Sequence, residues 1–119
     1  MSDLSIDMNK NLHKECWSLT PEAAKALIDK GAVVIDVRSQ QSQNAVSITG
    51  SIQFEKGDVI DFANDNADTN IILYCNTGGG ARATALEARN ANCLNVFDIA
   101  GGLYAWSAAG FPVMQRFNP

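Results

Sequence analysis

Cys75 stands at the end of an apolar run and is followed by three glycines, in the stretch ILYCNTGGGARAT that covers residues 72–84. A loop of free backbone N–H groups that leads into a helix favours anions. Such surroundings favour the thiolate, the nucleophilic form of cysteine. Glycines also let the amides converge on the sulfur without blocking an incoming anion. The stretch predicts a reactive thiol; a buried inert cysteine and a simple glycine turn are the alternatives.

The same glycines also fit a dinucleotide-binding pattern. Gly78, Gly80 and Ala83 have the fingerprint spacing, and Asp98 lies 20 residues after Gly78, where an acidic residue would bind a ribose. Few residues follow Asp98, however, whereas this fingerprint normally opens a longer domain. A nucleotide P-loop is excluded, because no Lys-Ser/Thr pair follows the glycines. Dinucleotide binding is therefore the lesser alternative.

The remaining cysteines predict no second site. Cys93 falls in an expected helix with Ala83 and Leu86 on roughly the same side, so we expect it in the core, and Cys16 is expected to be incidental. An odd number of cysteines, three, argues against a disulfide framework and for a reducing, cytoplasmic location. His13 and Cys16 could be half of a metal site, but no second ligand pair follows. We expect neither a metal nor a cofactor.

Length and charge restrict the function classes. The chain has 119 residues, of which 46% are apolar and 18% charged, which suits one globular domain. Its net charge of -4 argues against nucleic acid or an anionic membrane as the main partner. No apolar run approaches the roughly 20 residues that span a bilayer. We expect a loosely ordered arm over residues 1–16 and a single domain over 17–119.

Alternating strands and helices must position Cys75. Thr20-Pro21-Glu22 is a helix start, with a hydroxyl N-cap, a proline at the first position and an acid in the first turn. Apolar runs predict buried strands over residues 32–37 and 70–75, a turn and a short strand are expected within 47–54, and 95–99 is expected to be a third main strand. Further helices are expected over 58–63, 82–93 and 101–110. This order predicts an α/β domain with a mainly parallel sheet, and sites in such sheets lie at the carboxyl ends of strands.

Several ordered motifs resemble the rhodanese family over residues 19–113. The segment LTPEAAKALIDKGAVVIDVRS is similar to the family's opening helix and strand, VSITGSIQF to its middle segment, and IILYCNTGG to the strand and loop of its catalytic cysteine. The segment NVFDIAGGLYAWSAAGFPV is close to the family's ending and is the most specific match. The resemblance implies a rhodanese-like three-layer domain, whose mainly parallel central sheet is flanked by helices.

The resemblance also implies a thiosulfate sulfurtransferase. Cys75 would be the catalytic nucleophile that takes the outer sulfur of thiosulfate or a related anionic donor as a persulfide. Cyanide in an assay, or a thiol or protein acceptor in a cell, would then remove this sulfur. The substrate-binding loop would comprise residues 76–82, which are Asn76, Thr77, Gly78, Gly79, Gly80, Ala81 and Arg82.

Two departures and two supporting residues qualify this assignment. Many members carry an arginine at the position of Gly80, so thiosulfate is expected to bind less tightly here, and Arg82 is the nearest cation in the sequence. The family's middle histidine is replaced by Ser47. Arg38 is expected to pair with a nearby acid rather than to act as a cation at the mouth of the site. Asp36 is expected to brace the loop as a hydrogen-bond acceptor.

Two rival classes share this site. A phosphatase of the Cys-x5-Arg type needs an arginine six residues after Cys75, and that residue is Ala81. A rhodanese-like domain could also act as a sulfur carrier or a protein-interaction module without turnover. The retained Cys75 and the unobstructed glycines favour the enzyme over the module.

Overall fold

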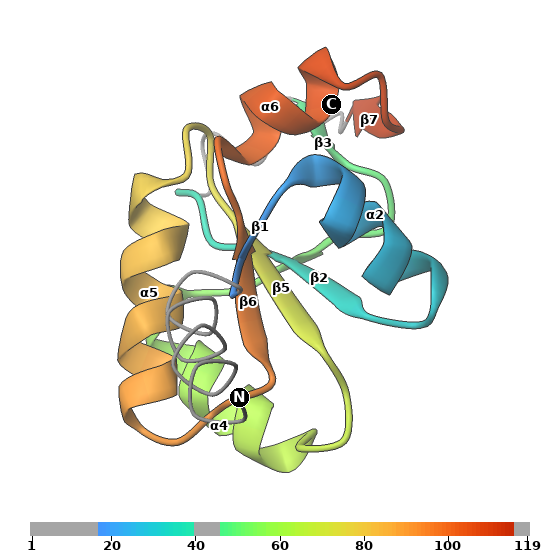
Figure 1. Cartoon of the computed structure of the whole chain (residues 1–119). Helices are drawn as coiled ribbons and strands as arrows, with labels where there is room; N and C mark the ends of the chain where they lie inside the picture. The colour runs from blue at the N-terminus through green and yellow to red at the C-terminus, as the bar shows by residue number, and fades with distance from the viewer. Residues whose placement is uncertain (1–16, 40–45, 116–119) are drawn as a thin grey trace, which may run out of the picture.

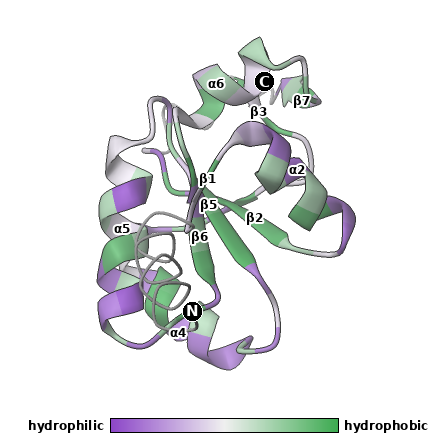
Figure 2. Cartoon of the chain, viewed as in Figure 1, coloured by the Kyte–Doolittle hydropathy of each residue, from purple (hydrophilic) through white to green (hydrophobic). Residues whose placement is uncertain are grey.

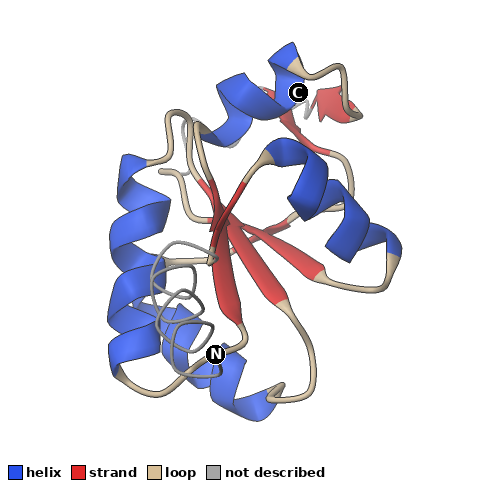
Figure 3. Ribbon diagram, in the orientation of Figure 1, coloured by secondary structure: helices blue, strands red, loops and turns tan. Residues whose placement is uncertain are grey.

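A parallel five-stranded sheet forms the centre of the fold in the computed structural model, which describes residues 17–39 and 46–115 (Figure 3). Within these ranges the strand order is β1-β6-β5-β2-β4, and every neighbouring pair is parallel. The strands are β1 (Ser18–Leu19), β2 (Val33–Asp36), β4 (Ile52–Gln53), β5 (Ile71–Tyr74) and β6 (Val96–Ile99). The prediction of a mainly parallel α/β sheet is confirmed, while the expected arm over 1–16 lies outside the described residues.

Helices cover both faces of this sheet and complete the three expected layers (Figure 1). On one face lie α4 (Val59–Asp65) and α5 (Gly79–Asn90), and on the other α2 (Pro21–Asp29) and α6 (Gly102–Ala108). Alternate residues of β5 enter the two cores, so that Leu73 packs toward α4 and α5 and Tyr74 toward α2 and α6. The central strands are accordingly mostly apolar (Figure 2), and the exceptions are two buried acids, Asp36 at the end of β2 and Asp98 in β6.

The start of α2 follows the expected capping chemistry. The Thr20 hydroxyl accepts a hydrogen bond from the N–H of Ala23 at 3.1 Å, and Pro21 occupies the first helical position. Gly31 follows the helix with a φ of +107°, a conformation that favours glycine. This part of the fold was predicted correctly from local sequence.

The side of α5 that faces the sheet was predicted wrongly. The helix begins at Gly79, earlier than expected, and Ala83 and Leu86 are exposed. Cys93 is buried as predicted, but it follows the end of the helix instead of lying on it. Alanines occupy positions all around this segment, so hydropathy does not distinguish one face of the helix from another. The buried side consists of Ala81, Thr84, Ala85 and Ala88.

A small antiparallel sheet was not predicted. It pairs β3 (Val46–Ile48) with β7 (Val113–Gln115), two strands of three residues each. Strands this short show no periodicity, and their pairing joins segments far apart in the sequence. Between β4 and α4 lies a single turn of 3₁₀-helix, η1 (Lys56–Asp58), which bears on the site described next.

Candidate active site

The Cys75 thiol lies at the carboxyl end of β5, within a turn of backbone amides. Its Sγ accepts hydrogen bonds from the N–H of Gly78 at 3.1 Å and from the N–H of Ala81 at 3.4 Å. Gly78 has a φ of +105°, a left-handed conformation that glycine adopts without strain. The side chain of Cys75 is half-buried. Two N–H donors aimed at one sulfur stabilise negative charge on it.

The first turn of α6 binds the backbone at the start of this loop through two hydrogen bonds. The N–H of Leu103 donates to the carbonyl of Cys75 at 2.8 Å, and the N–H of Tyr104 donates to the carbonyl of Asn76 at 3.1 Å. A Cβ on Gly102 would overlap the carbonyl oxygens of Cys75 and Asn76, so only glycine permits this approach. The Gly101-Gly102 pair of the sequence is therefore part of the support of the thiol loop.

A buried ion pair also holds the start of this loop, through the side chain of Asn76. The carboxylate of Asp36 accepts hydrogen bonds from the Arg38 backbone N–H at 3.0 Å, from Arg38 Nη2 at 2.8 Å and from the Tyr74 hydroxyl at 3.0 Å. Arg38 Nη1 in turn donates to Asn76 Oδ1 at 3.0 Å, directly after the cysteine. The expected pairing of Arg38 with an acid is confirmed, and Asp36 is the acceptor that braces the loop through Arg38.

The surroundings of this ion pair shift the pKa of Arg38 and of the neighbouring Tyr74. Burial opposes the charge on Arg38, but the hydrogen bonds and the negative charge of Asp36 outweigh it, so the pKa of Arg38 is raised above its ordinary value. Burial likewise raises the pKa of Tyr74, so its hydroxyl stays protonated as a donor to Asp36. Ser47, which occupies the position of the expected histidine, is buried and accepts a hydrogen bond from Arg38 Nη2 at 3.1 Å.

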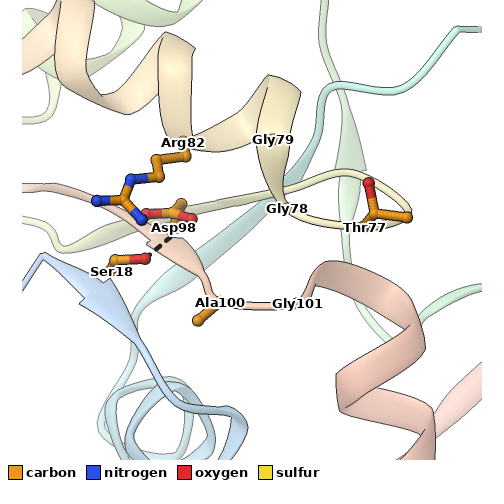
Figure 4. A pocket seen from close by; sticks show the side chains of 8 residues that line it. All are labelled: Ser18, Thr77, Gly78, Gly79, Arg82, Asp98, Ala100 and Gly101. Carbon is orange, nitrogen blue, oxygen red and sulfur yellow. Dashed lines mark hydrogen bonds between the residues drawn. The ribbon is translucent and has the colours of Figure 1, made fainter.

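The other predicted loop residues do not all face the sulfur. Gly80 does, because a Cβ built on it would lie 3.9 Å from Cys75 Sγ. Arg82 instead lines a separate pocket of about 220 Å³, in which Figure 4 shows its guanidinium beside Asp98. Its Cζ lies 5.6 Å from the centre of the Trp17 ring. The residues that line this pocket, among which Cys75 is absent, are Ser18, Thr77, Gly78, Gly79, Arg82, Asp98, Ala100 and Gly101.

This pocket contains the acid that the dinucleotide alternative required. Asp98 is fully buried; its Oδ2 accepts a hydrogen bond from the Ser18 hydroxyl at 3.4 Å, and its Oδ1 has no partner. Burial raises the pKa of Asp98 to about 6, although the Ser18 hydrogen bond and the Arg82 charge act in the opposite direction. The pocket is also smaller than the roughly 300–1,000 Å³ of usual ligand sites, which argues against a dinucleotide.

The raised pKa of Asp98 predicts a specific pH dependence of stability. Because the folded state holds this proton more tightly than the unfolded state, the free energy of unfolding should fall as the pH rises from about 4 to about 6. An Asp98→Asn variant should therefore be more stable than the wild type at pH 8, by on the order of 2–3 kcal/mol, and the difference should disappear near pH 4. Urea unfolding at both pH values measures this, and an equal difference at the two values would contradict it.

The sequence did not predict that Lys56 lies beside the thiol loop. The Nζ of Lys56, in η1, lies 3.1 Å from the position of a Cβ on Gly80. In the sequence Lys56 lies in a polar stretch, EKGD, that is well separated from Cys75 and carries no motif. Its positive charge in an otherwise acidic stretch is the only signal that could have marked it.

The described part of the chain offers neither a metal-binding cluster nor a membrane-spanning helix. Over the ranges 17–39 and 46–115, no group of three or more His, Cys, Asp or Glu side chains could hold a metal ion. In the same ranges, none of the helices has the length and apolar character needed to cross a bilayer.

Comparisons with known proteins agree with this geometry. The family model of the rhodanese-like domain matches residues 20–109. A thiosulfate sulfurtransferase GlpE of Pseudomonas entomophila is 34% identical over 89 residues, which cover 74% of this chain and 82% of that relative. The solved structure of a rhodanese-related protein from Thermoplasma volcanium superimposes with a TM-score of 0.68 at 26% identity, covering 82% of this chain and 96% of the other. A rhodanese-like domain from Anabaena gives a TM-score of 0.69 at 23% identity, covering 83% of this chain and 79% of that domain.

Proposed function

The chain belongs to the rhodanese-like domain family, and from this membership we propose that it is a sulfurtransferase whose nucleophile is Cys75. The observation that carries the proposal is the position of Cys75 Sγ, which accepts hydrogen bonds from the amides of Gly78 and Ala81. These donors suit both a thiolate and the persulfide that replaces it. Sulfurtransferase relatives support the reaction class, and thiosulfate is the substrate proposed here for this chain.

In the first step the Cys75 thiolate attacks the outer sulfur of thiosulfate. A sulfur–sulfur bond forms to Cys75 as the bond inside thiosulfate breaks, and sulfite leaves with the electron pair. Cys75 then carries an anionic persulfide. Gly80, which lies beside Cys75 Sγ, contributes no side chain that would hinder the terminal sulfur.

In the second step a thiophilic acceptor attacks the terminal sulfur of the persulfide. Cyanide would leave as thiocyanate, and a thiol would leave as a new persulfide, while the electron pair returns to Cys75 as a thiolate. No cofactor or metal takes part in this proposal. A cytoplasmic location is part of it, because the free Cys75 and Cys93 thiols suit a reducing compartment.

The measurement that tests this proposal is the intact mass of the protein after incubation with thiosulfate. We expect a gain of one sulfur atom that is absent from a Cys75→Ser variant and that disappears, with release of thiocyanate, when cyanide is added. A reduced protein that gains no sulfur, from thiosulfate or from a thiol-based sulfane donor, would contradict it. That result would favour the alternative function, a non-catalytic interaction module.

A further inference from the structure

The amine of Lys56, which lies outside the thiol loop in sequence, is placed beside Gly80 of that loop. A Cβ built on Gly80 would lie 3.1 Å from Lys56 Nζ, 3.7 Å from Lys56 Cε and 3.9 Å from Cys75 Sγ. The amine of Lys56 and the sulfur of Cys75 therefore flank one point, the place of the side chain that Gly80 lacks. Because Gly80 has no side chain, no Cβ stands between the ammonium group and the nucleophile at this point.

The amine of Lys56 has no partner among the described residues of the protein. Its side chain is exposed, and among the described residues it has neither an ion pair nor a hydrogen bond. The other two cations near the loop are engaged elsewhere: Arg38 is bound to Asp36 and Asn76, and Arg82 lies in the pocket with Asp98. Of these three cations, Lys56 is the one whose charge lies beside position 80 and is available to a substrate.

The proposed reaction needs such a charge. A thiolate and a thiosulfate dianion must approach each other, and the same total charge of three must be held through the transition state while it moves to the persulfide and sulfite. The amides of Gly78 and Ala81 stabilise the sulfur of Cys75 but are directed at that atom. The oxygens of the donor need a separate positive partner, because charge-assisted contacts are the strong ones in anion binding.

We propose that Lys56 is a substrate-binding residue that holds the oxyanion end of the sulfur donor and makes the site selective for donors of higher negative charge. This inference rests on the proposed function and adds a residue to it. Gly80 contributes to this site because it has no side chain beside the amine of Lys56. A Cβ there would lie 3.1 Å from the amine, close enough that Lys56 would have to shift slightly.

The test compares two donors that react in the same way but differ by one charge, thiosulfate and methanethiosulfonate. A Lys56→Gln variant should lose about tenfold in kcat/KM with thiosulfate and distinctly less with methanethiosulfonate. A Lys56→Arg variant should retain most of the wild-type value. Lys25→Gln is the matched control, because Lys25 is a lysine paired with Asp29 on α2, and it should leave both donors unchanged.

A rescue experiment separates charge from structure. Gly80 has no positive φ, so an arginine at this position is compatible with the backbone and would begin beside the sulfur. Adding Gly80→Arg to Lys56→Gln should restore much of the lost thiosulfate activity. Equal losses with both donors, or no loss with either, would overturn the assignment of Lys56.

A binding measurement keeps this inference apart from the proposed function. In a Cys75→Ser background no sulfur can be transferred, yet thiosulfate can still bind, and calorimetric titration measures its affinity. Adding Lys56→Gln should weaken this affinity about tenfold and reduce its dependence on salt. Unchanged affinity would overturn the role of Lys56 whether or not the wild-type protein forms a persulfide. The absence of persulfide in the wild type, with weakened binding in the variant, would contradict the proposed function alone.

Discussion

Replacing Cys75 with serine is expected to lower the rate of sulfur transfer from thiosulfate to cyanide by roughly a thousandfold or more, to the rate without protein. A hydroxyl is not ionised at neutral pH and forms no persulfide, so the first step loses its nucleophile and the second step loses the persulfide that the acceptor would attack. The fold should persist, because the serine oxygen can accept from the same amides of Gly78 and Ala81 that now bond to Sγ. Steady-state thiocyanate formation and the thermal midpoint measure the two effects.

The matched control for this variant is Cys93→Ser. Cys93 is buried, and its Sγ lies 3.5 Å from Asn64 Oδ1, on the α4 and α5 side of the sheet. A serine there should leave kcat/KM within about twofold of the wild type, since no reacting group is near and neither step uses this thiol. Transfer that survives Cys75→Ser but is lost in Cys93→Ser would show that Cys93 is the nucleophile, and it would contradict the assignment to Cys75.

Replacing Asp36 with asparagine is expected to cost about 3–5 kcal/mol of unfolding free energy, because the charge of Arg38 would remain buried without its partner. The Asp36 side chain is completely buried, that of Arg38 is 4% exposed, and Nη2 lies 2.8 Å from Oδ2. The bond from Arg38 to Asn76 should loosen with it, so sulfur transfer should fall even under conditions in which the variant stays folded. Urea unfolding and kcat/KM at low temperature measure these two losses.

Asp29→Asn provides the comparison for this prediction. It removes the same charge from a pair on α2, Lys25–Asp29, whose N–O distance is also 2.8 Å but whose side chains are 31% and 60% exposed. Exposed pairs of this kind contribute at most about 1 kcal/mol. A similar loss of stability in both variants would show that the Asp36–Arg38 pair has no special role in the fold.

Local sequence was sufficient for much of this protein. The capping residues Thr20 and Pro21 predicted where α2 begins, apolar runs predicted β2 and β5, and residues 95–99 predicted β6. Cys75 was predicted at the carboxyl end of its strand, and the glycines were predicted to direct amides at a thiol. These conclusions hold because capping, burial on both faces and left-handed turns depend on residues close together in the chain.

Contacts between distant segments were decided by the tertiary structure alone. The antiparallel pairing of β3 with β7 was not predicted, nor was the support of the Cys75 carbonyl by Leu103 of α6. The apolar side of α5 was predicted wrongly, since alanines lie all around it and only packing against the sheet selects a face.

The charges around the thiol show the same division. Arg82, which is near Cys75 in the sequence, lies with Asp98 in a separate pocket. Lys56, which carries no motif, places its amine beside Gly80. The sequence by itself predicted the nucleophile and its loop, and it indicated the family that the comparison shows. Which cation accompanies the thiol was decided only by folding, because a side chain's position depends on the packing of its whole element and not on its distance from Cys75 along the chain.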